Sequence, residues 1–329
     1  MEGASTIENS PIKSRAPARH RYSDPRHTVQ CTCDLERHNF ISRGYYSLTS
    51  KSNFKSCWRS QEWLKSLDAC SVEDFEALMS SPLETDQFAD SIKQIDLDLA
   101  RTYPDEPYFS KGSGQIALRR CLLAFSKYDM KLGYVQGMNF IMASLLWHST
   151  EVDAFWLFVR LMEYYELRDT YLPSLPGLSK HSQIIQLLLI DYLPKVYTCL
   201  AEHRIGSEVY AAEWCFTLFA SAIPPSQIHH ILDHFFQRGW GFFYRFVVTL
   251  LQCLEKKLVK ANDPLEVLFS LKVCNRPRAE NNEFLEVLGP RMTWLKLTRR
   301  ALALYIDESY INQLHLCFNI DTARFTIKP

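Results

Sequence analysis

A long series of amphipathic segments is the feature that most constrains the fold of this chain. Between Cys57 and Ile306, apolar residues recur with the 3.6-residue period of an α-helix. Prolines and glycines interrupt the series repeatedly, and each interruption ends one helix and lets the chain turn back. Extended structure has a single candidate, a short arm within residues 40–53. The sequence therefore predicts an all-α, multi-helix domain of stacked antiparallel helices.

Length, composition and charge limit the class of protein. The chain has 329 residues, of which 47% are hydrophobic, enough for one large core with tails. Its 37 basic residues equal its 37 acidic ones, so no nucleic-acid partner is expected. No apolar run reaches the roughly 18 residues that span a bilayer, which argues against direct membrane insertion. Ten scattered cysteines, mostly within apolar helical segments, indicate the reduced thiols of a cytoplasmic protein.

Composition divides the chain into three regions. Residues 1–38 are rich in Ser, Pro and Arg and nearly lack apolar residues, so we expect a disordered tail. Residues 39–275 carry most of the helical pattern and are expected to form the main domain. Residues 276–329 are expected to add accessory helices, among them one from Trp294 to Ile306, and a final tail.

Two groups of residues resemble metal ligands, and we interpret neither as a metal site. Cys31 and Cys33 lie in the polar tail, and their spacing fits no common zinc module. His230 and His234 would share one face of a helix, but no cluster of cysteines or carboxylates accompanies them. Histidines on an amphipathic helix are more often solvated, so we expect these two, and His229 beside them, to lie on its polar face.

The first chemically suggestive block is a short helix that ends near Arg101. Ile95, Asp98 and Arg101 are three residues apart, so a helix places all three on one face. Pro104 must stop this helix soon after Arg101. Taken alone, Asp98 and Arg101 would be an ordinary ion pair on a helix surface, worth a few tenths of a kcal/mol.

The second block is the loop that follows the next helix. Gly112 and Gly114 break the chain, residues 116–128 have a helical period, and Gly133 offers the left-handed turn that ends helices. Gln136 then lies in a loop just before the next predicted helix, residues 138–148. Because that helix is almost entirely apolar, we expect it at the centre of the fold.

Both blocks resemble the fingerprints of the TBC domain of Rab GTPase-activating proteins, I-x-x-D-x-x-R followed by T-x-P, and Y-x-Q-G-M-N. The segment from Glu213 to Leu251 resembles a third family block, and the whole resemblance covers roughly residues 60–273. Ten residues match the first two fingerprints without a gap: Ile95, Asp98, Arg101, Thr102, Pro104, Tyr134, Gln136, Gly137, Met138 and Asn139.

Two departures from the family pattern accompany the resemblance. Leu232 stands where the family usually has Trp, whereas Asp233 keeps the acidic position beside it, and we interpret the change as a packing substitution. Near the N-terminus, the segment CWRSQEWLKSL is a shortened form of a longer family segment with an Arg-to-Trp signature. The resemblance thus makes residues 39–275 a TBC domain with a contracted N-terminal part.

The resemblance implies a GTPase-activating protein for a Rab-type small GTPase, acting on its GTP form in vesicle trafficking. Arg101 and Gln136 would be catalytic fingers supplied in trans, and Asp98, Tyr134, Gly137 and Asn139 would support them. No cofactor would belong to this chain, because Mg²⁺ and GTP arrive with the GTPase. Such a protein stimulates its partner's hydrolysis and has no turnover without it.

A second function remains compatible with the same fold. The chain could be a non-catalytic adaptor or scaffold that binds a Rab without stimulating it. Retention of both Arg101 and Gln136 favours catalysis, because a protein that only binds has no physical reason to keep a phosphate-facing pair. In either case we expect a cytoplasmic protein that its GTPase partner recruits to endomembranes.

Overall fold

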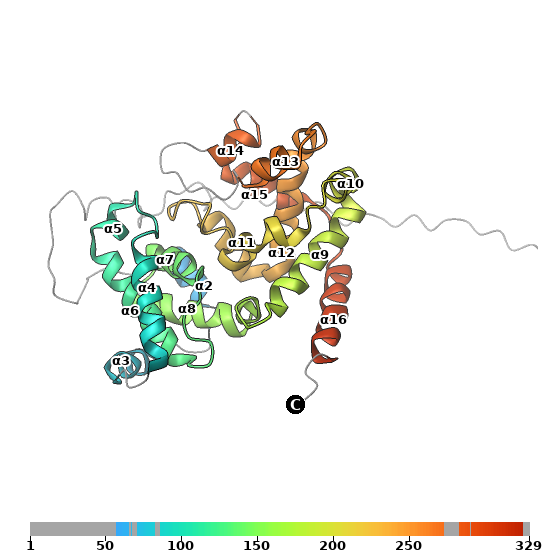
Figure 1. Ribbon diagram of the computed structural model, residues 1–329. Coiled ribbons are helices and arrows are strands. Elements are labelled where there is room, and N and C mark those ends of the chain that lie inside the picture. The colour runs from blue at the N-terminus through green and yellow to red at the C-terminus, as the bar shows by residue number, and fades with distance from the viewer. Residues whose placement is uncertain are drawn as a thin grey trace, which may run out of the picture.

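In the computed structural model, the chain is all-α, as the sequence predicts (Figure 1). The structure describes residues 57–65, 67, 71–82, 86–272, 283–289 and 291–324, and these residues contain no β-strand. The helices are α2 (Trp58–Leu64), α3 (Val72–Ser80), α4 (Asp86–Leu99), α5 (Pro107–Ser110), α6 (Ser113–Tyr128), α7 (Met138–His148), α8 (Glu151–Glu163), the 3₁₀ turn η2 (Leu167–Thr170), α9 (Pro176–Tyr192), α10 (Pro194–Glu202), α11 (Ser207–Thr217), α12 (His229–Leu258), α13 (Pro264–Lys272), α14 (Glu283–Val287), α15 (Trp294–Ala303) and α16 (Glu308–Arg324).

Most helices begin and end where local sequence signals predict. Helix α3 follows Ser71, whose hydroxyl accepts a hydrogen bond from the backbone N–H of Asp74, the cap expected for a serine in this position. Helix α6 begins at Ser113, three residues before its apolar pattern does. Gly114 therefore lies in the first turn of α6 and does not break the chain, and a glycine is needed there because a Cβ would collide with the ring of Tyr108.

Three elements differ from the sequence-based prediction. Residues 171–181 contain two prolines and a glycine, a composition that predicts a connector. Helix α9 nevertheless begins within them, with Pro176 in the first helical turn, where its missing N–H costs nothing. Helix α12 runs through Gly239, whose φ of 54° makes a kink between two arms. Helix α16 has no counterpart in the prediction, and it packs on α9 through Ile311 and Leu314.

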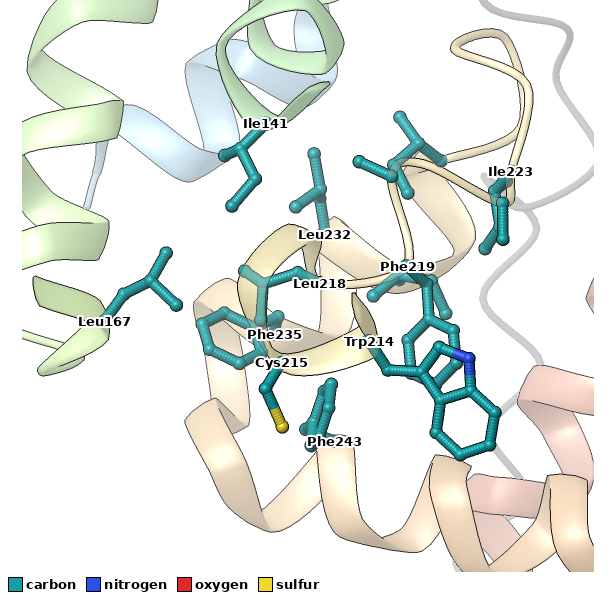
Figure 2. Packing of buried hydrophobic residues seen from close by; sticks show 14 of the residues in the cluster. Ile141, Leu167, Trp214, Cys215, Leu218, Phe219, Ile223, Leu232, Phe235 and Phe243 are labelled. Carbon is teal, nitrogen blue, oxygen red and sulfur yellow. The ribbon is translucent and has the colours of Figure 1, made fainter. Parts of the chain in front are cut away.

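The core lies around α7, α8, α11 and α12. Every residue of α7 except Phe140 is buried, which confirms the central position expected from its apolar sequence. Between α11 and α12, Trp214 stacks on Phe219 with ring centroids 5.3 Å apart, and Phe219 also contacts Phe243 (Figure 2). Leu232 is buried in the same cluster, as expected for a packing substitution.

Helix α2 is fixed to this core by one buried carboxylate. The guanidinium of Arg59 forms an ion pair with Asp233 on α12, and the indole N–H of Trp63 donates a 2.9 Å hydrogen bond to the same side chain. Arg59 and Trp63 come from the shortened N-terminal segment, and Asp233 comes from the third block. The acidic position beside Leu232 therefore holds two distant parts of the chain together.

Two predictions fall outside the described residues. They are the disordered tail, residues 1–38, and the possible extended arm, residues 40–53. The division at residue 275 also falls in a segment that is not described, so the domain limits remain predictions.

Candidate functional site at the ends of helices α4 and α7

Arg101 lies just beyond the C-terminal end of α4, as the sequence predicts. Its backbone N–H donates a hydrogen bond to the carbonyl of Asp98, so the chain makes one further turn after the last residue of the helix, Leu99. The guanidinium Nη2 lies 2.6 Å from Asp98 Oδ1. The Arg101 side chain is 47% exposed, whereas that of Asp98 is 1% exposed. The pair therefore joins a buried carboxylate, that of Asp98, to an accessible guanidinium, that of Arg101, and is not an ordinary ion pair between two surface side chains.

The carboxylate of Asp98 has further partners besides Arg101. The phenol of Tyr134 donates a 2.6 Å hydrogen bond to Oδ2, and the side-chain amide of Gln94 donates a 3.1 Å hydrogen bond to Oδ1. A buried carboxylate needs such donors, because an unpaired buried charge is costly. Two donors would still satisfy Asp98 if the guanidinium of Arg101 turned outward toward a ligand.

Gln136 lies in the loop before α7, between two glycines with positive φ. Gly133 has φ of 64° and Gly137 has φ of 106°, conformations that favour residues without a side chain. The N–H of Gly137 donates a 3.1 Å hydrogen bond to the side-chain oxygen of Asn139, which stabilises the loop at the start of α7. Gln136 itself is exposed, and its side-chain amide makes no hydrogen bond with the described residues.

Two buried hydrogen bonds connect the loop to the end of α4. Besides the bond from Tyr134 to Asp98, the amide of Asn139 donates a 2.7 Å bond to Oγ1 of Thr102. The Thr102 hydroxyl in turn donates a 2.6 Å bond to the carbonyl of Asp98. Arg101 lies between Asp98 and Thr102 in sequence, and Gln136 lies between Tyr134 and Asn139. The structure thus brings the two predicted blocks together at one surface.

The C-terminal end of α11 packs against the loop that carries Gln136. A Cβ on Gly137 would lie 3.4 Å from the Cβ of Phe216, so the loop backbone rests directly on this helix. The ring of Phe216 stacks on Tyr171 at 5.7 Å, and the Tyr171 hydroxyl donates a hydrogen bond to the Phe216 carbonyl. No spacing signal in the sequence relates Gln94, Tyr171 or Phe216 to the two blocks, so only the structure reveals these supports.

The electrostatics of the site keep Tyr134 a hydrogen-bond donor. Burial, and then its hydrogen bond to the Asp98 carboxylate, raises the pKa of the Tyr134 phenol well above its usual value. The phenol therefore remains protonated at neutral pH and continues to donate to Asp98. The polar centre of the site has one fixed carboxylate, one exposed cation and one exposed neutral amide.

The histidines of α12 differ from expectation. The sequence predicts a solvated face for all three, but His229 and His234 are each only 9% exposed, because α12 packs against both α2 and α15, and His230 is partly buried. His229 contacts His148 on α7, and burial lowers the pKa of His229. Within the described ranges, no three His, Cys, Asp or Glu side chains form a group that could bind a metal ion. Likewise, no helix among those residues has the length and apolarity to cross a membrane.

Comparison with known proteins identifies the family. The sequence model of the Rab-GTPase-TBC domain matches residues 55–259, more than half of the chain. The chain belongs to the Rab-GTPase-TBC domain family. The matched range contains both fingerprints and the third block, so the resemblance seen in the sequence is confirmed.

Individual relatives share the TBC domain and differ in length. Human TBC1 domain family member 1 is 36% identical over 174 residues, 52% of this chain and 15% of that protein. The Rab GTPase-activating protein eat-17 of Caenorhabditis elegans is 33% identical over 193 residues, 58% of this chain and 21% of that protein. This chain thus matches about a fifth or less of these relatives' lengths.

A solved structure shows the same fold. The flagellar RabGAP TBC domain of Chlamydomonas superposes with a TM-score of 0.61 at 21% identity, covering 82% of this chain and 92% of that one. The helical architecture of the TBC domain is therefore present here.

Proposed function

We propose that this TBC domain stimulates GTP hydrolysis by a Rab-family small GTPase, and thereby regulates vesicle trafficking. One observation carries the proposal. An exposed arginine and an exposed glutamine lie on two segments of the chain that buried hydrogen bonds around Asp98 and Thr102 join. Such an arrangement presents two polar groups outward, where they can enter the nucleotide site of another protein.

Arg101 would supply positive charge to the transferred phosphoryl group. The γ-phosphate passes through a loose transition state in which charge spreads over its oxygens, so stabilising that charge is most of catalysis. A guanidinium is planar and permanently charged, and can contact two oxygens at once. When supplied in trans, such an arginine is worth about 10³ to 10⁵ in rate. The ion pair with the buried carboxylate of Asp98 would orient the guanidinium of Arg101.

Gln136 would position the attacking water. Its amide both donates and accepts a hydrogen bond, so it can hold a water in line with the γ-phosphate without a change of charge. The exposed state of the Gln136 amide, which has no hydrogen bond to the described residues, suits that task, because no internal bond must break first. Mg²⁺ and GTP would arrive bound to the Rab, and no cofactor would belong to this chain.

The relatives are consistent with this proposal. The matched C. elegans protein eat-17 is described as a Rab GTPase-activating protein, and the matched Chlamydomonas structure is described as a RabGAP TBC domain. The alternative, a Rab-binding adaptor without catalytic activity, would use the same fold but would not need Arg101 or Gln136 to face outward.

Phosphate release from a panel of purified, GTP-loaded Rabs tests the proposal. We expect this protein to accelerate hydrolysis by at least one Rab at catalytic concentration. Arg101→Ala should abolish most of the acceleration, whereas Arg299→Ala, which removes an exposed arginine of α15, should not. Binding of a GTP-loaded Rab without acceleration would support the adaptor, and the absence of both binding and acceleration across the panel would contradict both functions.

A further inference from the structure

We propose that Leu97 on α4 is the apolar docking contact through which this protein binds its GTPase, and that it sets affinity, not the rate of the chemical step. The inference rests on the proposed function and adds to it a residue that the fingerprints leave unassigned. It follows from the position of Leu97 relative to Arg101 and from the residues around it.

Leu97 is one of the largely exposed leucines of the structure. It is 69% exposed, although Ile95, Asp98 and Leu99 on the same helix are all buried. It is not among the residues that form the hydrophobic core or pack against it. Water therefore covers most of its side chain in the free protein, and burial by a partner would be favourable in proportion to the apolar area removed from water.

Leu97 lies in the last turn of α4, which ends at Leu99, and Arg101 follows in the turn just beyond that end. Only three residues separate the two, so both lie at the same end of the helix. The bond from the Arg101 N–H to the Asp98 carbonyl keeps the chain turning after the last helical residue. Ala100, which precedes Arg101, is also exposed, and its small side chain lets another protein approach closely.

Insertion of Arg101 into a partner would bring that partner against the end of α4, where Leu97 lies. A stable interface buries about 800 Å² on each protein, an area far wider than one turn of a helix. A GTPase whose nucleotide accepts the guanidinium of Arg101 would press against the last two turns of α4. The exposed side chain of Leu97 would then be covered by the GTPase.

Charged residues of α4 and α6 surround Leu97. Asp96, beside it, forms an ion pair with Arg119 of α6 at 2.7 Å, and both side chains are nearly half exposed. One turn earlier, Lys93 is exposed as well. An apolar centre bounded by charged residues is the usual composition of a binding surface. The matching surface on the GTPase should be an apolar patch beside its nucleotide site, bordered by polar groups.

Because Leu97 carries no charge and no hydrogen-bonding group, it cannot stabilise the developing charge on phosphate. Its contact would be equally strong in the bound complex and in the transition state. Loss of such a contact raises KM and leaves kcat unchanged, whereas loss of a finger lowers kcat. This difference separates the docking role from a catalytic one.

The test uses the GTP-loaded Rab that the wild-type protein activates most strongly in the panel. Leu97→Ala should raise KM about tenfold, the effect expected for losing a few buried methyl and methylene groups, with kcat within about twofold of wild type. Leu97→Met, which keeps the apolar volume, should restore most of the affinity. The matched control is Leu316→Ala on α16, where the leucine is 62% exposed. Figure 1 shows α16 beside α9, far from α4.

The outcomes separate this inference from the proposed function. If the wild-type protein activates a Rab but Leu97→Ala has wild-type KM, the docking role is wrong and the finger mechanism stands. If Leu97→Ala lowers kcat at unchanged KM, Leu97 acts on the chemistry and the inference is also overturned. If Leu316→Ala raises KM as much as Leu97→Ala, the effect is not local to α4. Circular dichroism spectra and melting temperatures are measured for every variant, and values equal to those of the wild-type protein exclude a folding defect.

Discussion

The phenol of Tyr134 donates a 2.6 Å hydrogen bond to the buried carboxylate of Asp98, across 36 residues of sequence. Tyr134 begins the loop that carries Gln136, and Asp98 pairs with Arg101. One hydrogen bond therefore couples the positions of two exposed side chains from different parts of the chain. Asn139 and Thr102 form a second buried connection beside it.

Replacement of Arg101 should remove activity without affecting the fold. We expect Arg101→Ala to lower stimulated GTP hydrolysis by at least ~10²-fold, because it removes a cation from the transferred phosphoryl group. Arg101→Lys should be nearly as inactive, since an ammonium keeps the charge but cannot make the planar contact with two oxygens. Single-turnover hydrolysis measures the effect, with Arg299→Ala as the matched control. Wild-type stimulation by Arg101→Ala would rule out the arginine finger.

Replacement of Gln136 tests the second finger independently. Gln136→Ala should also lower stimulated hydrolysis by at least ~10²-fold, because the attacking water loses its positioning group. Its melting temperature should match wild type, since the side chain makes no internal hydrogen bond with the described residues. Gln186→Ala, an exposed glutamine on α9, is the control. Full activity of Gln136→Ala would mean that the GTPase positions its own water.

Loss of the Tyr134 hydroxyl should affect activity and stability together. Tyr134→Phe leaves one oxygen of the buried Asp98 carboxylate without its phenol donor, at a cost of about 1.5–3 kcal/mol in the free energy of unfolding. We expect stimulated hydrolysis to fall about tenfold, because Arg101 and the Gln136 loop lose their shared anchor.

The control for this change is Tyr310→Phe. Its hydroxyl donates to Asp191 in an exposed pair between α16 and α9, so the change should cost less than about 1 kcal/mol. Urea denaturation and hydrolysis assays on the two variants measure the difference. Equal losses in the two variants would show that burial of the Asp98 network does not increase the contribution of its hydrogen bonds to the free energy of unfolding.

The buried pair between Arg59 and Asp233 should be essential for folding. Asp233→Ala leaves the guanidinium of Arg59 buried without its carboxylate and removes the acceptor of the Trp63 indole. Breaking a buried pair in this way costs about 3–5 kcal/mol. Chemical denaturation measures the loss, and Lys65→Ala, which breaks an exposed pair with Glu62, should change stability by less than about 1 kcal/mol. A small loss in Asp233→Ala would show that α2 is held mainly by apolar packing.

Stability should fall as the pH drops below neutrality. Burial lowers the pKa of His181 well below its usual value, and burial together with Lys180 lowers the pKa of His315 to about 4. These histidines are neutral in the folded state but titrate near 6.5 when unfolded. Unfolding therefore takes up protons, so the stability from this source is fully present above about pH 6.5 and is lost as the pH falls below that value, down to about pH 4 for His315.

Urea unfolding at several pH values between neutrality and about pH 5 measures this dependence. His315→Gln, which cannot be protonated, should reduce the slope of stability against pH. The ring of His315 accepts or donates a 3.1 Å hydrogen bond to Tyr244, and a glutamine amide can take over that role. An unchanged slope in His315→Gln would assign the effect to other groups.

Periodicity and turn residues determined most of the helices. The apolar series defined α7 residue for residue, and Gly133 marks a turn where the sequence predicts it. The two fingerprints singled out Arg101 and Gln136 through residue types at short, fixed spacings. These signals are local, because a helix depends on residues three and four apart, and a turn depends on the conformations its own residues allow.

The tertiary structure decided which polar residues are buried and which segments meet. The sequence does not reveal that Asp98 is almost fully enclosed, that Phe216 supports the Gln136 loop, or that Asp233 joins α2 to α12. Nor does it indicate that Leu97 stays exposed while Ile95 and Leu99 on the same helix are buried. Burial depends on contacts between residues far apart in the chain, and a local pattern carries no information about which distant helix covers a given face.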